Sequence, residues 1–347
     1  MDSVILSPYN SKYLGKLKNR IVMAPMSRWS ADQNHCVIDL MSEYYIRRAK
    51  DGVALIITEG LIIHPSAAGH KNSPYIYTAE QANSWKKTIS GVHRQGAKMF
   101  CQLWHCGRIS HEDFTGGIQP VSSSAKRAEG INKQNNKPYA RPRALTRSEI
   151  KDVYEMFIKS GELAFGAGFD GAELHFGHGY LVDQFFDSRI NERKDEYGGS
   201  VDNRCRFALE LTELFINKFG SEKVMVRISP SREMAGVYDW PEIEEMLACL
   251  ISNFNKIGLR LLDISCASSD YYKTSGRVVR IVRPIWPHFL LSGASLSLRQ
   301  AEAEVAAGLL DMVTWGRYIL ANPDFVSCLL SGKKLNQFKP EFLKKLY

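Results

Sequence analysis

Short, continuously apolar runs recur along this chain of 347 residues, and patterns typical of helices separate most of them. A short run without polar interruption is typical of a strand buried on both faces, as in a parallel sheet with helices packed on either side. We predict eight such strands, over residues 19–26, 53–58, 98–103, 170–174, 223–229, 260–265, 288–292 and 311–315.

The alternation of these strands with helices predicts an α/β fold, a (β/α)8 TIM barrel, for which this length is ordinary. The alternative is an open doubly wound sheet, but no Gly-x-Gly-x-x-Gly turn follows an early strand. No linker is evident, so we predict a single domain over residues 1–347, with an elaborated loop after the third strand, 106–145. A loop of this length is usually a lid or a binding element. Helices are expected over about 41–50, 79–95, 146–166, 204–219, 241–258 and 297–307.

Composition narrows the classes of function. The formal net charge is +8, from 45 basic and 37 acidic residues, but the charges are dispersed and no nucleic-acid motif accompanies them. We therefore expect a solvated basic surface and no nucleic-acid partner. The 7 cysteines form no CxxC pair, which favours reduced thiols in a cytoplasmic protein and argues against a zinc or iron–sulfur site. We expect neither a secretory signal nor a membrane-spanning stretch.

Two imidazoles and a phenol follow the fourth predicted strand. In the stretch 175–180, His175, His178 and Tyr180 are separated by small or apolar residues, and the glycines let the backbone bend so that the three side chains converge. Each imidazole has an N–H to offer to a carbonyl oxygen, and the phenol is a proton donor. A metal pair is the alternative reading, but no third ligand is evident at suitable spacing.

Polar and glycine residues also follow the other strands. In such a barrel the reacting groups collect at the carboxyl ends of the strands, and the loops after strands seven and eight often bind phosphate. Strand seven ends at Gly293 and Ala294, and strand eight ends at Gly316 and Arg317, where exposed backbone N–H groups and a forked cation suit that role. The remaining strand ends supply Ser27, Glu59, Gly60, Gln102, His105 and Arg227.

Several longer motifs accompany these residues. They are Ala24-Pro25-Met26-Ser27-Arg28, Gln102-Leu103-Trp104-His105, His175-x-x-His178-Gly-Tyr180-Leu181, Asn191-x-Arg193-x-Asp195-x-Tyr197-Gly198-Gly199-Ser200, Trp315-Gly316-Arg317 and Asn322-Pro323-Asp324. With them the chain resembles the Old Yellow Enzyme family, which comprises flavin-dependent ene-reductases on a (β/α)8 barrel. The likeness covers nearly the whole chain.

The resemblance implies that FMN is held in the mouth of the barrel. Ser27 would bond the flavin near O4, Gly60 would let the ring approach the backbone, and Gln102 would bond its pyrimidine edge. Arg227 would face the N1–C2 carbonyl side, where a cation stabilises the negative charge left by reduction. The cofactor-binding set implied in this way is Pro25, Ser27, Gly60, Gln102, Arg227, Gly293, Ala294, Gly316 and Arg317.

The resemblance also implies the reaction. Hydride would pass from NADPH or NADH to FMN and then to the β-carbon of an enone-type small molecule, an α,β-unsaturated carbonyl compound. His175 and His178 would bind the carbonyl oxygen, and Tyr180 would protonate the α-carbon. Trp29 and Trp104 are either walls of the substrate pocket or core aromatics, and the block 191–206 is expected to be scaffold.

Two features depart from the family pattern, and other classes of function stay open. The family usually has Thr or Cys at the position of Ser27, and many members continue after the region of Phe338 with a tail that helps wall the pocket. These two departures bear on the flavin potential and on the choice of substrate. NADPH and NADH both stay open as the donor, and a homodimer is a further expectation. The alternatives are a flavin-free barrel enzyme on a phosphorylated substrate, such as an aldolase, and a flavin-binding protein without turnover.

Overall fold

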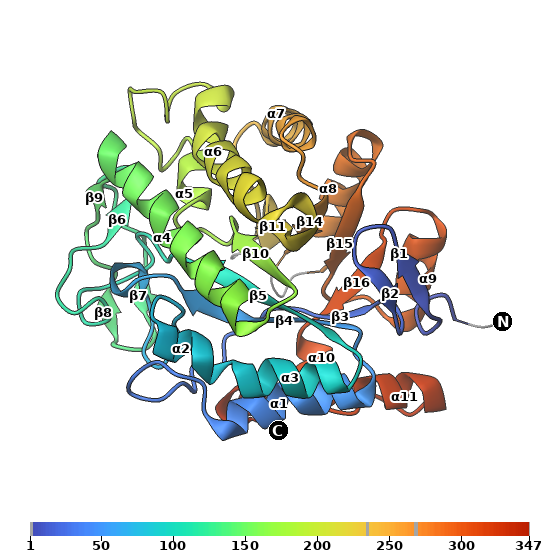
Figure 1. Ribbon diagram of the computed structural model, residues 1–347. Helices are drawn as coiled ribbons and strands as arrows, with labels where there is room; N and C mark the ends of the chain where they lie inside the picture. Colours follow the sequence, from blue (N-terminus) through green and yellow to red (C-terminus); the bar gives the residue numbers. More distant parts are fainter. Residues whose placement is uncertain (1–2, 234–235, 267–269, 347) are drawn as a thin grey trace.

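Eight parallel strands close into a barrel, as the sequence predicted, in a computed structural model that describes residues 3–233, 236–266 and 270–346 (Figure 1). Every strand pairs in parallel with the next one, and the last pairs with the first. The barrel strands are β3 (Ile21–Met23), β4 (Leu55–Ile62), β5 (Lys98–Trp104), β10 (Gly171–His175), β11 (Val224–Ile228), β14 (Leu261–Ile264), β15 (Phe289–Gly293) and β16 (Met312–Trp315).

The inside of the barrel has an apolar part and a polar part. Val22, Leu55, Phe100, Met225 and Leu261 are buried against one another in one interior cluster. Because side chains alternate along a strand, the inward residues two positions further on form the next layer towards the carboxyl ends. That layer is polar and buried, and it contains Gln102, Glu173, Arg227 and Asp263.

Helices surround the strands, and their ends follow local sequence rules (Figure 1). Thr146 closes a capping box at the start of α4, as predicted, and Ser297 closes another at α9. Gly52 and Gly168 end α1 and α4 in the left-handed conformation. The helices are α1 (Asp39–Asp51), α2 (Ala79–Ser84), α3 (Lys86–Arg94), α4 (Arg147–Ala167), α5 (Asp183–Phe186), α6 (Val201–Phe219), α7 (Ile243–Lys256), α8 (Ser275–Val282), α9 (Leu298–Ala306), α10 (Arg317–Ala321) and α11 (Phe325–Ser331).

Three helical predictions need correction. The helix expected over 79–95 is two helices, α2 and α3, which meet at the fully buried Trp85. The helix expected from 204 begins earlier, at Val201, because Ser200 caps it by accepting a hydrogen bond from the Asn203 N–H. No helix was expected between strands six and seven, where α8 lies.

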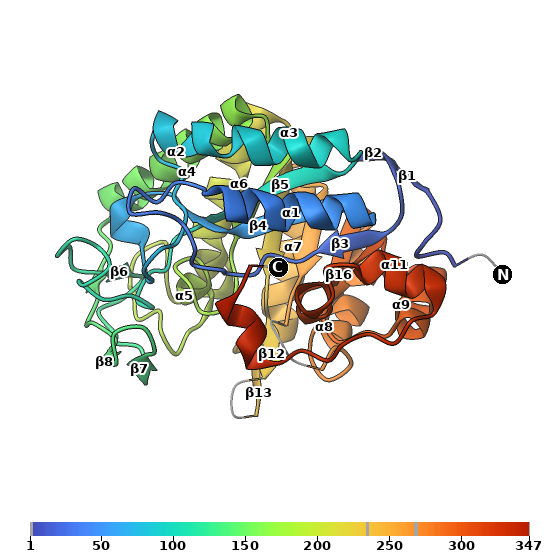
Figure 2. The same cartoon turned by 90° about the horizontal axis from the view of Figure 1, so that it is seen from below.

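Small strand pairs and 3₁₀ turns lie outside the barrel. The long loop 106–145 contains two of these pairs, and β12 and β13 form an antiparallel pair at the edge of the molecule (Figure 2). No helix among the described residues is long and apolar enough to cross a membrane. The remaining elements are β1 (Tyr9–Ser11), β2 (Gly15–Leu17), β6 (Val121–Ser122), β7 (Ile131–Asn132), β8 (Lys137–Pro138), β9 (Arg143–Ala144), β12 (Ser231–Glu233), β13 (Val237–Asp239) and the 3₁₀ turns Pro65–Ala67, Ser221–Lys223, Arg283–Ile285 and Pro340–Lys344.

Candidate active site

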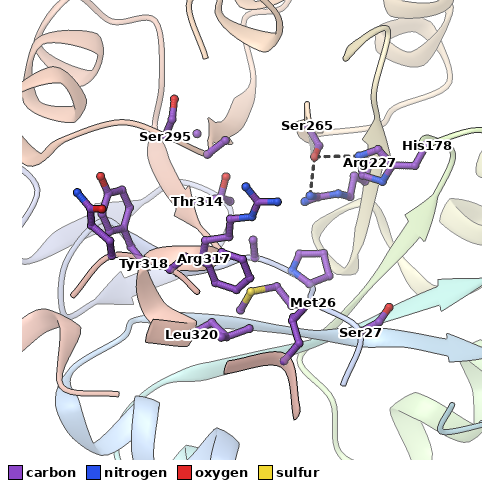
Figure 3. Close-up of a pocket in the computed structure, with 18 residues that line it drawn as sticks. Met26, Ser27, His178, Arg227, Ser265, Ser295, Thr314, Arg317, Tyr318 and Leu320 are labelled. Atoms are coloured by element: carbon purple, nitrogen blue, oxygen red, sulfur yellow. Dashed lines mark hydrogen bonds between the residues drawn. The ribbon is translucent and has the colours of Figure 1, made fainter. Parts of the chain in front are cut away.

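A cavity of about 540 Å³ opens at the carboxyl ends of the barrel strands (Figure 3). Its volume is within the range of small-molecule and cofactor sites, about 300–1,000 Å³. Arg227 and Arg317 point into it from opposite sides, and no carboxylate is among its described lining residues. The lining residues are Ala24, Pro25, Met26, Ser27, His178, Arg227, Ser265, Gly293, Ala294, Ser295, Thr314, Gly316, Arg317, Tyr318, Leu320, Gln337, Phe338 and Leu343.

The wall near Arg317 is built from tightly packed backbone. A Cβ atom on Gly293 would lie 2.1 Å from the carbonyl oxygen of Thr314 on the neighbouring strand, so only glycine fits there. Ala294 follows with φ of 126°, a conformation that L-residues rarely adopt, and its N–H donates to the same Thr314 oxygen over 3.2 Å. The Arg317 guanidinium lies 4.9 Å from the ring centroid of Phe338, so the C-terminal segment helps to form this wall.

Arg227 enters the cavity already oriented by two buried side chains. Its Nη1 donates to Asp263 Oδ2, and its Nη2 donates to Ser265 Oγ over 2.6 Å. Ser265 Oγ also lies 3.2 Å from His178 Nε2, which links the cation to the imidazole (Figure 3). These contacts leave Arg227 Nε buried with no hydrogen-bond partner in the described part of the chain.

A smaller cavity of about 90 Å³ adjoins the larger one, and the two share Pro25, Ser27, His178 and Arg227 as walls. The predicted substrate-binding side chains meet here. The ring centroid of Tyr180 is 4.7 Å from that of Trp104 and 5.2 Å from that of His175, both edge to face. The complete lining is Pro25, Ser27, Gln102, Trp104, His175, His178, Tyr180 and Arg227.

The turn after β10 is strained, and neighbouring groups hold it in place. His178 has φ of 59°, in the left-handed region that favours glycine. Its N–H donates to Ser229 Oγ over 2.5 Å, and the next N–H, of Gly179, donates to Asp183 Oδ2 over 2.5 Å. A Cβ atom on Gly177 would lie 2.7 Å from Ser229 Oγ, so this glycine allows the turn to pack on β11.

Burial keeps the three reactive side chains uncharged. It lowers the pKa of His175 and His178 well below the ordinary value, and the nearby Arg227 guanidinium lowers both further. Burial raises the pKa of the Tyr180 phenol. At neutral pH the site therefore presents two neutral imidazoles, each with one N–H, and one protonated phenol.

The loop that carries Ser27 is tied to both the barrel and the C-terminal segment. The backbone N–H groups of Arg28 and Trp29 donate to Glu59 Oε2 over 2.8 and 3.1 Å. The Arg28 Nη2 donates to the carbonyl oxygens of Phe342 and Lys345 over 3.0 and 2.6 Å. Leu343, between these two, lines the larger cavity, so the segment that contains it helps to wall the pocket.

Two predicted site residues lie next to the cavities without lining them, beside Trp104 or its neighbour His70. Gly60 lines neither cavity, and its lack of a side chain makes room for Trp104, whose ring would lie 2.5 Å from an added Cβ atom. Trp29 also lines neither cavity and packs on His70, with ring centroids 5.1 Å apart. Sequence reasoning missed Met26, Ser265, Ser295, Thr314 and Leu343, and only their places at or just beyond strand ends could have suggested the first four.

The block 191–206 is scaffold in the structure. The Asn191 side chain donates to the carbonyl oxygens of Phe185 and Tyr197, each over 2.8 Å. Arg193 donates to Ser123 and Leu145, which joins this block to the long loop. In the described residues, no cluster of His, Cys, Asp or Glu could hold a metal ion.

The residues at the mouth fit FMN. The larger cavity carries two guanidinium groups and no described carboxylate, which suits a phosphate monoester and an anionic ring edge. Arg227 Nε and Trp104 Nε1, on side chains that line the smaller cavity, are buried without a partner in the described chain, and such donors suit a polar ligand. At Gly293 the backbone of the neighbouring strand comes so close that only glycine fits, which leaves this part of the cavity wall without a side chain.

The model of the NADH:flavin oxidoreductase / NADH oxidase family matches residues 6–336. The chain belongs to this family. It is 34% identical over 357 residues to "12-oxophytodienoate reductase 7" of Oryza sativa subsp. japonica, covering 96% of this chain and 89% of that protein. It is 33% identical to the "Probable flavin mononucleotide-dependent alkene reductase" of Leishmania infantum, covering 93% and 90% of the two chains.

Solved structures agree with this family membership. The Old Yellow Enzyme homologue of Zymomonas mobilis superposes with a TM-score of 0.90 at 30% identity, over 98% of this chain and 96% of that one. The predicted membership of the Old Yellow Enzyme family is therefore confirmed, together with the barrel fold. The protein is an FMN-dependent NADH:flavin oxidoreductase in which a nicotinamide nucleotide is the electron donor.

Proposed function

We propose that this flavin oxidoreductase reduces the carbon–carbon double bond of an α,β-unsaturated carbonyl compound, with NADPH or NADH as the donor. The observation that carries the proposal is the meeting of His175, His178 and Tyr180 in a small cavity beside the larger, cationic one. The names of the rice and Leishmania relatives support this substrate class. When bound, FMN supplies a carrier that accepts two electrons from the nicotinamide and passes them to the electron-poor alkene.

His175 and His178 bind the carbonyl oxygen of the substrate. Because both imidazoles are neutral, each offers one N–H, and neither brings a charge that must be desolvated. These hydrogen bonds strengthen as negative charge develops on the oxygen, so they stabilise the transition state more than the ground state. The contact between His178 Nε2 and Ser265 Oγ, 3.2 Å long, holds one ring in position.

Tyr180 donates the proton to the α-carbon. Its phenol stays protonated because burial raises its pKa. The edge-to-face contact with Trp104 fixes the ring, and Trp104 forms one wall of the substrate pocket. A positioned acid of this kind typically contributes about 10²–10⁴-fold to the rate.

The remaining residues hold FMN. Arg227, which lines both cavities, would supply a fixed cation that favours negative charge on the reduced ring. Gln102, Ser27 and Pro25, which line the smaller cavity, would hold the ring by hydrogen bonds and packing. We assign the phosphate to the cradle formed by Gly293, Ala294, Gly316 and Arg317.

The alternatives have less support. A flavin-free aldolase would need a lysine at a strand end, and in the described chain none of the barrel strands ends in one and no lysine lines either cavity. A flavin-binding protein without turnover would have no use for two imidazoles and a phenol held in a strained turn.

Absorption spectroscopy of the purified protein tests the proposal. The protein should be yellow, and the cofactor released by heat should be FMN, not FAD, by chromatography. Anaerobic NADPH or NADH should bleach the flavin band, and a simple enone should restore it. A colourless protein that does not bind added FMN contradicts the cofactor assignment, and a bleached protein that no enone restores supports the reading without turnover.

Three further predictions stand as proposals. We expect residues 1–347 to unfold in one transition as a single domain, which calorimetry tests. The cysteine pattern supports a cytoplasmic location, which cell fractionation tests. We also expect the protein to form a homodimer, which a mass measured by light scattering tests.

A further inference from the structure

Two carboxyl groups, Glu173 and Asp263, lie inside the barrel with no exposed surface. Each is two residues before a residue that lines a cavity, His175 on β10 and Ser265 beyond β14. Because side chains alternate along a strand, the two carboxyl groups point inward one layer deeper than the cavities. They line neither cavity in the described structure. They lie in the layer of side chains directly beneath the cavity lining, which we call the floor of the site.

Each carboxyl group has one oxygen with a donor and one without. Glu173 Oε2 accepts from Gln102 Nε2 over 2.6 Å, and Asp263 Oδ2 accepts from Arg227 Nη1. No N–H or O–H of the described residues reaches Glu173 Oε1 or Asp263 Oδ1. Each carboxyl group also acts on the proton equilibrium of the other, so the two lie close together inside the barrel. Two ionised carboxylates can only accept, so neither can satisfy the other's buried oxygen unless one of them carries a proton.

The surrounding charges lead to the same conclusion. Among the described residues, the ionisable groups that act on the pair are Arg227 from β11 and Cys101 from β5, and His175 lies two residues beyond Glu173 on β10. Burial raises the pKa of the Cys101 thiol and lowers that of His175, so both are neutral. One cation thus faces two carboxyl groups. With one proton the cluster is neutral, and with none it holds a net negative charge that is removed from water.

We propose that Glu173 and Asp263 share one proton, and that this proton keeps the floor of the FMN site neutral. The proposal rests on the proposed placement of FMN against Arg227. With the proton in place, the carboxyl pair carries one negative charge, which the Arg227 cation neutralises through Asp263. The side of the guanidinium that faces the cavity then remains available to the cofactor. Without it, a second negative charge lies beneath the edge of the cofactor that becomes anionic on reduction. Glu173 and Asp263 are therefore positioning residues that act through Gln102 and Arg227.

The proposal predicts that FMN binding weakens as pH rises. Burial and mutual repulsion raise the pKa of Glu173 above its ordinary range. The proton is therefore present at neutral pH and is lost as pH rises through that raised pKa. Because loss of the proton weakens FMN binding, the Kd should rise by up to about tenfold per pH unit above the pKa.

The first test is infrared spectroscopy of the holoenzyme. Glu173→Gln keeps an acceptor for Gln102 and a donor for Asp263, so it imitates the protonated acid. The difference spectrum, wild type minus Glu173→Gln, should contain the C=O stretch of a protonated carboxyl group at neutral pH. Absence of this band would overturn the proposal. If Glu173→Gln does not fold, Asp263→Asn makes the same test, because it also leaves one carboxylate beside Arg227.

The second test is the Kd of FMN, measured by quenching of flavin fluorescence from about pH 6 to about pH 9.5. The wild-type Kd should rise at alkaline pH, and that of Glu173→Gln should stay flat. Glu304→Gln is the matched control, since Glu304 is buried but bonds Tyr271 and Arg280 outside the barrel. It should keep the wild-type pH dependence, and the same dependence in Glu173→Gln would contradict the proposal.

These outcomes separate the inference from the proposed function. Neither measurement involves an enone, so failure to reduce one does not affect them. A protein that binds no FMN at any pH contradicts the cofactor site, whereas normal FMN binding without the carboxyl band contradicts only the shared proton.

Discussion

Replacement of Tyr180 by phenylalanine separates the two halves of the catalytic cycle. The phenylalanine keeps the ring that contacts Trp104 at 4.7 Å and His175 at 5.2 Å, so only the proton donor is lost. Loss of a positioned acid costs about 10²–10⁴-fold in rate. At about 1.36 kcal/mol per factor of ten, the barrier rises by about 2.7–5.4 kcal/mol.

Stopped-flow measurement of each half-reaction provides the assay. Reduction of the flavin by the nicotinamide needs no proton donor near the enone, so Tyr180→Phe should leave its rate nearly unchanged. Reoxidation by an enone should slow by the factor above. In the wild type, this second rate should not fall near pH 10, the ordinary pKa of a tyrosine, because burial raises the pKa of Tyr180.

Tyr154→Phe is the matched control. The Tyr154 hydroxyl donates to Glu210 Oε2 over 3.2 Å between outer helices, so its loss should lower the free energy of unfolding by about 0.5–1.5 kcal/mol. Both half-reactions of this variant should be normal. Equal slowing of both halves in Tyr180→Phe would refute the assignment, because it would indicate a disturbed flavin site.

Three other changes test the cofactor site and the fold. Arg227→Met should lower the reduction potential of bound FMN, measured by redox titration, and an unchanged potential in a fully loaded variant would assign Arg227 a structural role alone. Gly293→Ala should weaken FMN binding and destabilise the protein by about 1–3 kcal/mol, because the new Cβ atom would lie 2.1 Å from the Thr314 oxygen. Gly166→Ala, in open space on a helix, should do neither. Burial lowers the pKa of His105 to about 3, so the unfolded chain binds a proton that the native protein does not. Stability should therefore fall as pH drops from about 6.5 towards 3, by up to about 1.4 kcal/mol per unit, and denaturant unfolding of His105→Asn should show a flatter pH dependence.

The elements that the sequence predicted correctly are those that residues adjacent in the chain determine. Each of the eight barrel strands is a short apolar run, and the start of α4 at Thr146 is a capping box that needs only four residues. The helix predictions were less accurate at the ends and breaks of helices, such as the start of α6, which the Ser200 cap sets at Val201. The break at Trp85 occurs at a side chain that the core buries completely.

The predicted position of the site residues followed from the fold class. Once the strands are parallel and closed, their carboxyl ends must meet, so Ser27, Gln102, Arg227 and Arg317 were expected at one mouth, and they line the two cavities there. The motif at 175–180 is local, and its three side chains lie within one turn of the backbone.

Tertiary structure alone decided the contacts between strands. The sequence gives no sign that Gly60 makes room for Trp104, or that Leu343 lines the cofactor cavity. The closeness of Glu173 to Asp263 depends on the closure and register of the barrel, since 90 residues separate them in the chain. Patterns over a few residues determine which segments become strands and what their ends carry. Which side chains then share a proton is set by distances across the barrel, and no local pattern encodes these.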